Sequence, residues 1–166
     1  LTYRAGSAAL REAQVRTEPV VLFVLSGGTS ATCTSWTDAC ELQAAITASQ
    51  EGDEIWVGAG TYKPTSGADR AVSFVLKDGV AIYGGFSGAE TLREQRNWTT
   101  NPTILSGEIG DPNQTNDNSY HVVTTIGVPA TTILDGFTIR DGGCRIQTHE
   151  VEGFSIKQAA WLFSGI

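Results

Sequence analysis

Basic residues and long apolar runs are both scarce in this chain. The 166 residues include 11 Lys plus Arg against 18 Asp plus Glu, which gives a formal net charge of -7 and a pI near 4.7. The arginines are scattered and leave no basic stripe for a phosphate backbone, so nucleic-acid binding is excluded. The longest apolar run, Val20 to Leu25, is far shorter than the roughly twenty residues of a membrane span. It also lacks a signal-peptide pattern, so we expect an exported protein whose signal has been removed.

Charged residues of either sign are few, at 17% of the chain. The chain has instead 20 Thr and 12 Ser, a bias that favours extended strands over helices. The length fits one domain, so composition predicts a single all-β domain.

There are only three cysteines. Cys33 and Cys40 enclose a short segment that could close as a disulfide in an oxidising compartment, and the alternative is two free thiols in a cytosolic protein. They form no CxxC pair, which makes a zinc site a poor interpretation. Cys144 is left over, as a buried thiol or a bond to another chain.

A repeated pattern runs through the glycines. It consists of an aliphatic residue, then Leu or an aromatic residue, then any residue, then Gly, with successive starts 22 to 31 residues apart. Six positions start it: Val24, Ile55, Ile82, Ile104, Ile133 and Leu162. A residue that recurs once per turn of a solenoid stacks on its counterparts, so we expect these six side chains to form one aliphatic ladder.

One segment departs from the β pattern. Within residues 39–51 apolar side chains fall at helical spacing, with Asp38 as the expected N-cap and Gly52 as the stop. We expect this amphipathic helix to cover the first coil of the solenoid.

Several segments resemble one known family. They are CTSWTDAC at 33–40, GDEIWVGAGTYKP at 52–64, GVAIYGGFSG at 79–88, TILSGEIG at 103–110 and LDGFTI at 134–139. Together they are similar to the N-terminal coils of bacterial secreted right-handed parallel β-helix proteins of the pectin-lyase-like superfamily. The resemblance implies an extracellular or cell-surface location.

The predicted fold is an all-β, right-handed parallel β-helix of about six short coils with an N-terminal capping helix. Residues 1–19 are a tail that could act as an assembly arm, and residues 20–166 are one β-helix domain.

No catalytic cluster stands out, so we expect no enzyme activity and no cofactor. Asp135 is the only acid in the repeat, and its nearest candidate partner on the neighbouring coil would be Glu108, whereas glycoside hydrolysis needs two paired carboxylates. The oxygen-rich loop that contains Asp111, Asp117 and Asn118 is a weaker candidate for Ca²⁺, with a solvated turn as the alternative.

The four tryptophans allow two interpretations. Trp36, Trp56, Trp98 and Trp161 could stack on sugar rings if they share a face, or they could seal corners and caps of the coil.

The last repeat lies at the C-terminal end of the sequence, where it predicts an exposed apolar coil. We therefore expect a non-enzymatic structural or adhesive protein that assembles head to tail with copies of itself into a filament or surface layer, through Val21, Phe23, Trp161, Leu162 and Phe163. The alternatives are a fragment of a polysaccharide lyase or hydrolase, and an adhesin module that binds cell-surface glycans.

Overall fold

The computed structural model describes residues 16–125, 131–143, 155–157 and 160–162. Residues 1–15 of the predicted tail, Cys144 and Phe163 lie outside these ranges.

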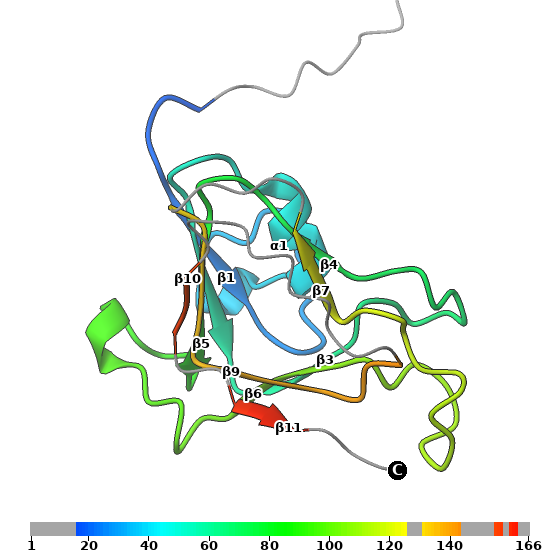
Figure 1. The fold of residues 1–166 in the computed structure, drawn as a ribbon. Helices are drawn as coiled ribbons and strands as arrows, with labels where there is room; N and C mark the ends of the chain where they lie inside the picture. Colours follow the sequence, from blue (N-terminus) through cyan, green and yellow to red (C-terminus); the bar gives the residue numbers. More distant parts are fainter. Residues whose placement is uncertain (1–15, 126–130, 144–154, 158–159, 163–166) are drawn as a thin grey trace, which may run out of the picture.

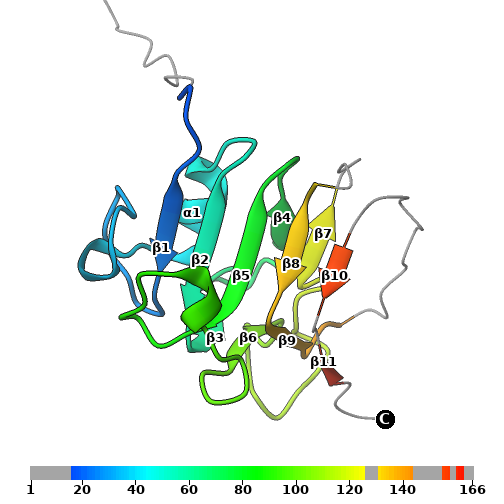
Figure 2. The ribbon, with the colours of Figure 1, turned by 90° about the vertical axis from the view of Figure 1, so that its left-hand side faces the viewer.

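Every strand in the described residues pairs in parallel with its neighbours. The largest sheet has the order β1-β2-β5-β8-β10, and Figure 2 shows these strands side by side. Its strands are β1 (Val21–Val24), β2 (Glu54–Gly58), β5 (Ala81–Phe86), β8 (Ile133–Asp135) and β10 (Ser155–Lys157).

Two smaller sheets complete the strand structure. One has the order β11-β9-β6-β3, and the other is the single pair β4-β7. Their strands are β3 (Gly60–Tyr62), β4 (Phe74–Leu76), β6 (Thr103–Ser106), β7 (Val123–Thr125), β9 (Phe137–Arg140) and β11 (Ala160–Leu162). Figure 1 shows the three sheets on different sides of a core that also contains the helix α1 (Leu42–Ala48).

The prediction of an all-β solenoid with about six coils is wrong. The described residues form three small separate parallel sheets and an α-helix, with no closed solenoid. The glycine pattern gave a wrong number of coils because it starts in strands of two different sheets. In one sheet it starts in β1, β2, β5 and β8, and in another it starts in β6 and β11. Counting its occurrences therefore does not count coils.

The predicted aliphatic ladder is also wrong in register. Ile55 and Ile82 are partners, as expected, but Val24 pairs with Val57 and Ile82 pairs with Leu134. Val24 is thus two residues away from the partner of Ile55, and Ile133 is one residue away from the partner of Ile82, so the six predicted positions do not form one ladder.

The largest sheet has two different faces. Its inner face is aliphatic and almost fully buried, with Leu22, Val24, Ile55, Val57, Ile82 and Leu134 in the main core. Its outer face is aromatic, with a separate buried cluster of Trp56, Tyr83 and Phe86. The alternation of strand side chains produces this division.

The helix is shorter than predicted. It spans Leu42–Ala48 instead of 39–51, and its N-cap is Glu41. Leu42, Ala45 and Ile46 are its buried residues, as helical spacing requires. Asp38 as N-cap is wrong, because Asp38 ends a separate 3₁₀ turn, η1 (Trp36–Asp38), that precedes the helix.

The outer edge of β1 is paired with a segment that is not a named strand. The Phe23 amide donates to the Cys33 carbonyl (2.8 Å), and the Cys40 amide donates to the Phe23 carbonyl (3.1 Å). Cys33 and Cys40 are joined by a disulfide, and we call residues 33–40 the disulfide loop. This loop therefore covers the edge of the sheet that β1 would otherwise expose.

Candidate functional site

A hollow of about 340 Å³ lies between the turn that follows β1 and the disulfide loop. Residues 25–30 form one side of it and residues 36–39 form the other. Figure 2 shows this part of the chain, in blue to cyan, beside β1 at one end of the largest sheet. The volume is within the range of small-ligand sites, so we treat the hollow as the candidate site.

The two sides of the hollow are fixed to each other. The Ser30 amide donates to the Ala39 carbonyl (3.2 Å), and the Leu25 amide donates to the Cys40 carbonyl (3.3 Å). Gly28 approaches so closely that a Cβ there would lie 2.7 Å from the Cys40 carbonyl oxygen. Only glycine allows this approach, so the sequence itself sets the width of the hollow.

Trp36 is the aromatic residue of the hollow. Its ring packs edge-on against Phe23, with 4.9 Å between centroids, and at a tilt against Phe86, at 5.5 Å. The indole N–H donates to the carbonyl of Glu90 (2.8 Å). The ring is half-buried, so these contacts hold it in one orientation while part of it remains accessible.

Glu90 organises the loop that supports Trp36. Its carboxylate accepts hydrogen bonds from the amides of Ser87 (2.7 Å), Gly88 (3.0 Å) and Ala89 (3.1 Å). The side chain of Glu90 therefore stabilises this turn, while its backbone carbonyl accepts the hydrogen bond from the Trp36 indole.

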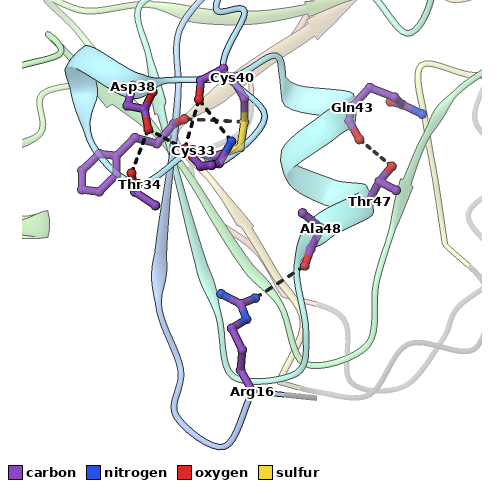
Figure 3. The surroundings of a disulfide bond; sticks show 11 residues. Arg16, Cys33, Thr34, Asp38, Cys40, Gln43, Thr47 and Ala48 are labelled. Atoms are coloured by element: carbon purple, nitrogen blue, oxygen red, sulfur yellow. Dashed lines mark hydrogen bonds between the residues drawn. A yellow bond between two sulfur atoms is a disulfide. The ribbon is translucent and has the colours of Figure 1, made fainter. Parts of the chain in front are cut away.

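Asp38 is the charged residue of the hollow. Its Oδ2 accepts hydrogen bonds from the hydroxyls of Thr32 and Thr34, the latter at 2.9 Å. In Figure 3 the side chains of Asp38 and Thr34 point toward one another beside the disulfide. Hydrogen bonds from Thr32, Ser30 and Thr34 lower the pKa of Asp38 below its ordinary value of 3.8, so it is ionised at neutral pH.

A second carboxylate lies at the rim of the hollow. Glu41 accepts a hydrogen bond from the amide of Gly27 (2.7 Å), and Gly27 has a left-handed φ of +78°. The rest of the lining consists of small, hydroxyl-bearing and glycine residues: Ser26, Gly27, Gly28, Thr29, Ser30, Thr37 and Ala39, with Leu25 as the aliphatic member. The site thus combines one aromatic ring, several hydroxyls and negative charge.

The described residues among those predicted for self-assembly lie in end strands of two different sheets. Val21 and Phe23 are half-buried on β1 and pack against the outer aromatic cluster. Trp161 and Leu162 lie in β11, at one end of the second sheet, and Phe163 is outside the described residues. Assembly through these residues stays a prediction, but the edge of β1 that it would use is already paired with the disulfide loop.

The residues predicted for Ca²⁺ are partly brought together. The carboxylate of Asp117 accepts a hydrogen bond from the Asp111 amide (2.7 Å), and Asn118 is buried. The Asp111 carboxylate is engaged by local donors, the Asn113 amide (3.0 Å) and the Gln114 side chain (3.0 Å). These contacts account for an Asp/Asn turn, and Ca²⁺ binding remains a prediction.

Asp135 and Glu108, the one pair of acids that a hydrolytic site would have needed, lie in different parts of the fold. Asp135 lies on β8 and forms an ion pair with Arg96 (3.0 Å), whereas Glu108 follows β6 in another sheet and accepts from the Gly110 amide (3.0 Å). In the part of the chain that the structure describes, no group of three or more His, Cys, Asp or Glu side chains could hold a metal ion.

The tryptophans were predicted either to stack on sugar rings or to seal the corners of the coil, and the described ones differ in their surroundings. Trp56 is buried and stacks on Phe86, with 4.8 Å between centroids and 10° between planes. Trp98 is 39% exposed on a loop, and Trp36 borders the hollow. Trp36 and Trp56 both contact Phe23 and Phe86 in the outer aromatic cluster, and the side chain of Trp161 lies outside the described residues.

Sequence reasoning missed the hollow itself. The sequence pattern predicted Asp38 as a helix cap, and it assigned the start of the segment 25–30 to the first glycine repeat. The signal was present in the sequence as a pair of glycines followed by a hydroxyl-rich segment that two cysteines flank.

Comparison with known proteins identifies no relative: no family model, curated protein or solved structure matches this chain. Within the described ranges, no helix is long and apolar enough to cross a membrane.

Proposed function

We propose that this protein is an extracellular glycan-binding module with an adhesive, non-catalytic role. The observation that carries the proposal is the hollow of residues 25–39, which joins a fixed tryptophan ring to a lining of hydroxyls, glycines and one carboxylate.

This combination matches the chemistry of a sugar ring. A sugar presents a C–H face that packs on an aromatic ring and hydroxyls that exchange hydrogen bonds with short polar side chains. Trp36 offers the ring, while Ser26, Thr37 and Asp38 offer donors and acceptors within the same hollow.

Rigidity supports binding over catalysis. The disulfide, the contacts of Gly28 and the pairing with β1 hold the site in place, and such preorganisation reduces the entropy lost on binding. Hydrolysis of a glycoside would need two opposed carboxylates, whereas the lining contains only Asp38 as an acid.

The paired edge of β1 also favours an adhesive role over growth of a filament. A head-to-tail strand addition needs a free edge, and hydrogen bonds from the disulfide loop occupy the edge of β1. The filament hypothesis would therefore require this loop to move.

The test is affinity electrophoresis of the purified protein in gels that contain neutral, acidic or amino polysaccharides. Retardation by at least one polysaccharide supports the proposal, and unchanged mobility in all of them contradicts it. Release of reducing or unsaturated ends during incubation would identify an enzyme instead.

Two variants locate the binding. Trp36→Ala should abolish retardation, and Trp98→Ala, which removes an exposed tryptophan outside the hollow, should leave it unchanged. Because Trp36 also packs against Phe23 and Phe86, Thr37→Tyr serves as a second variant that crowds the hollow from an exposed position. Retardation that survives Thr37→Tyr in a folded protein would place the site elsewhere.

A further inference from the structure

The charge of the hollow restricts which glycan can enter it. Asp38 is the only charged side chain in the lining, and Glu41 sits at its rim against Gly27. Neither Lys nor Arg is among the described lining residues. The whole chain carries a net charge of -7, which repels a polyanion at long range.

Acidic glycans are therefore disfavoured at this site. A uronate or a sulfated sugar would bring its negative group against the carboxylate of Asp38 without a cation to balance it. The negative charge of Asp38 persists at neutral pH, because three hydroxyl side chains stabilise the ionised form.

We infer that the hollow selects an amino sugar, a glucosamine-type unit with a free protonated amine. This inference rests on the proposed glycan-binding function and names the ligand class of the same site. The ammonium would form a charge-assisted hydrogen bond with Asp38, and Trp36 would offer both a stacking face and cation–π attraction. The hydroxyls of Ser26 and Thr37 would meet the hydroxyls of the ring.

The experiment is calorimetric titration with three oligosaccharides of equal length: glucosamine, N-acetylglucosamine and galacturonate tetramers. It is run near pH 5.5, where a primary amine is protonated and a carboxylate such as Asp38 is ionised. We expect the glucosamine tetramer to bind about tenfold more tightly than its acetylated counterpart, and the galacturonate tetramer to bind most weakly.

A matched pair of variants separates a specific contact from general attraction. Asp38→Asn should remove the preference for glucosamine, whereas Asp111→Asn should keep it. The two substitutions change the net charge equally, and hydrogen bonds lower the pKa of both carboxylates. An equal loss in both variants would show that only the net charge attracts the polycation, and would overturn the inference.

The outcomes also distinguish this inference from the function on which it rests. Equal affinity for the glucosamine and N-acetylglucosamine tetramers, or tighter binding of galacturonate, would overturn the amino-sugar preference while glycan binding stands. Binding of none of the tetramers, together with unchanged mobility in every polysaccharide gel, would overturn both.

Discussion

The disulfide loop and the loop of residues 110–118 hold a carboxylate in similar ways but are anchored differently. Asp38 in one loop is half-buried and Asp111 in the other is exposed, and hydrogen bonds from nearby donors lower the pKa of each. The disulfide loop is also tied to β1 by backbone hydrogen bonds and carries Trp36 against the outer face of the sheet. In loop 110–118 the Asp111 carboxylate is held by contacts within the loop, while the Arg70 side chain donates to the carbonyl of Asn118 (2.7 Å) at the end of the loop.

The comparison of the two loops indicates that an oriented carboxylate alone does not make a hollow. Local hydrogen bonds alone orient Asp111 in a turn that faces solvent. Asp38 gains a second side, residues 25–30, because Gly28 packs against the backbone at Ala39 and Cys40. A hollow requires two segments fixed relative to each other, as residues 25–30 and the disulfide loop are.

The largest effect should follow removal of the covalent anchor. Replacing both cysteines, Cys33→Ser with Cys40→Ser, should lower the free energy of unfolding by about 2 to 3 kcal/mol, because an eight-residue loop regains entropy in the unfolded chain. Chemical denaturation measures the change, and glycan binding should weaken in the same variant.

The comparison loop supplies the control for this variant. Gln114→Ala removes one anchoring side chain of loop 110–118, and we expect a change in unfolding free energy below about 0.5 kcal/mol, as for other surface sites. If the cysteine variant is as stable as Gln114→Ala, the disulfide does not anchor the site.

A smaller effect should follow from filling the closest approach between the two sides. Gly28→Ala places a methyl group 2.7 Å from the Cys40 carbonyl oxygen, so the two segments must separate. We expect a loss of about 1 to 3 kcal/mol in unfolding free energy, with weaker glycan binding. Gly67→Ala is the matched control, since a Cβ there meets nothing closer than 3.5 Å. Equal stability of the two variants would contradict the role of Gly28.

The smallest effect concerns the pH dependence of binding. Because the folded pKa of Asp38 is below its ordinary value of 3.8, the carboxylate stays ionised as the pH falls to that value and becomes protonated only below it. Calorimetric binding of the glucosamine tetramer should therefore stay nearly constant as the pH falls toward 3.8, and it should decline only below that value.

Thr34 sharpens this prediction. Thr34→Val removes a hydrogen bond to Asp38, which raises the pKa and should move the decline in binding to higher pH. A profile that is identical in the variant, or a loss of binding on acidification that is already centred near neutral pH, would mean that Asp38 does not control binding.

Local features of the fold could be predicted from the sequence. Alternating apolar residues predicted strands, and helical spacing of Leu42, Ala45 and Ile46 predicted a short helix where α1 lies. These patterns depend on neighbours along the chain, which the sequence shows directly.

Long-range relations were beyond the same reasoning. The glycine pattern could not reveal that Ile104 lies in a different sheet from Ile82, because both strand ends use the same residue types. The proposed role of Asp38 likewise depends on Gly28 and Trp36, which line the same hollow. Periodicity contains no information about such contacts.

The most direct test of the account is an NMR titration of the ¹⁵N-labelled protein with the glucosamine tetramer, with the backbone amides and tryptophan indoles assigned. The account predicts that the Trp36 indole signal and the amides of residues 26–39 shift in a saturable way. The Trp98 indole and the amides of residues 111–118 should stay in place. Shifts confined to Trp98 or to loop 110–118, or no saturable shift at all, would contradict the hollow as the binding site.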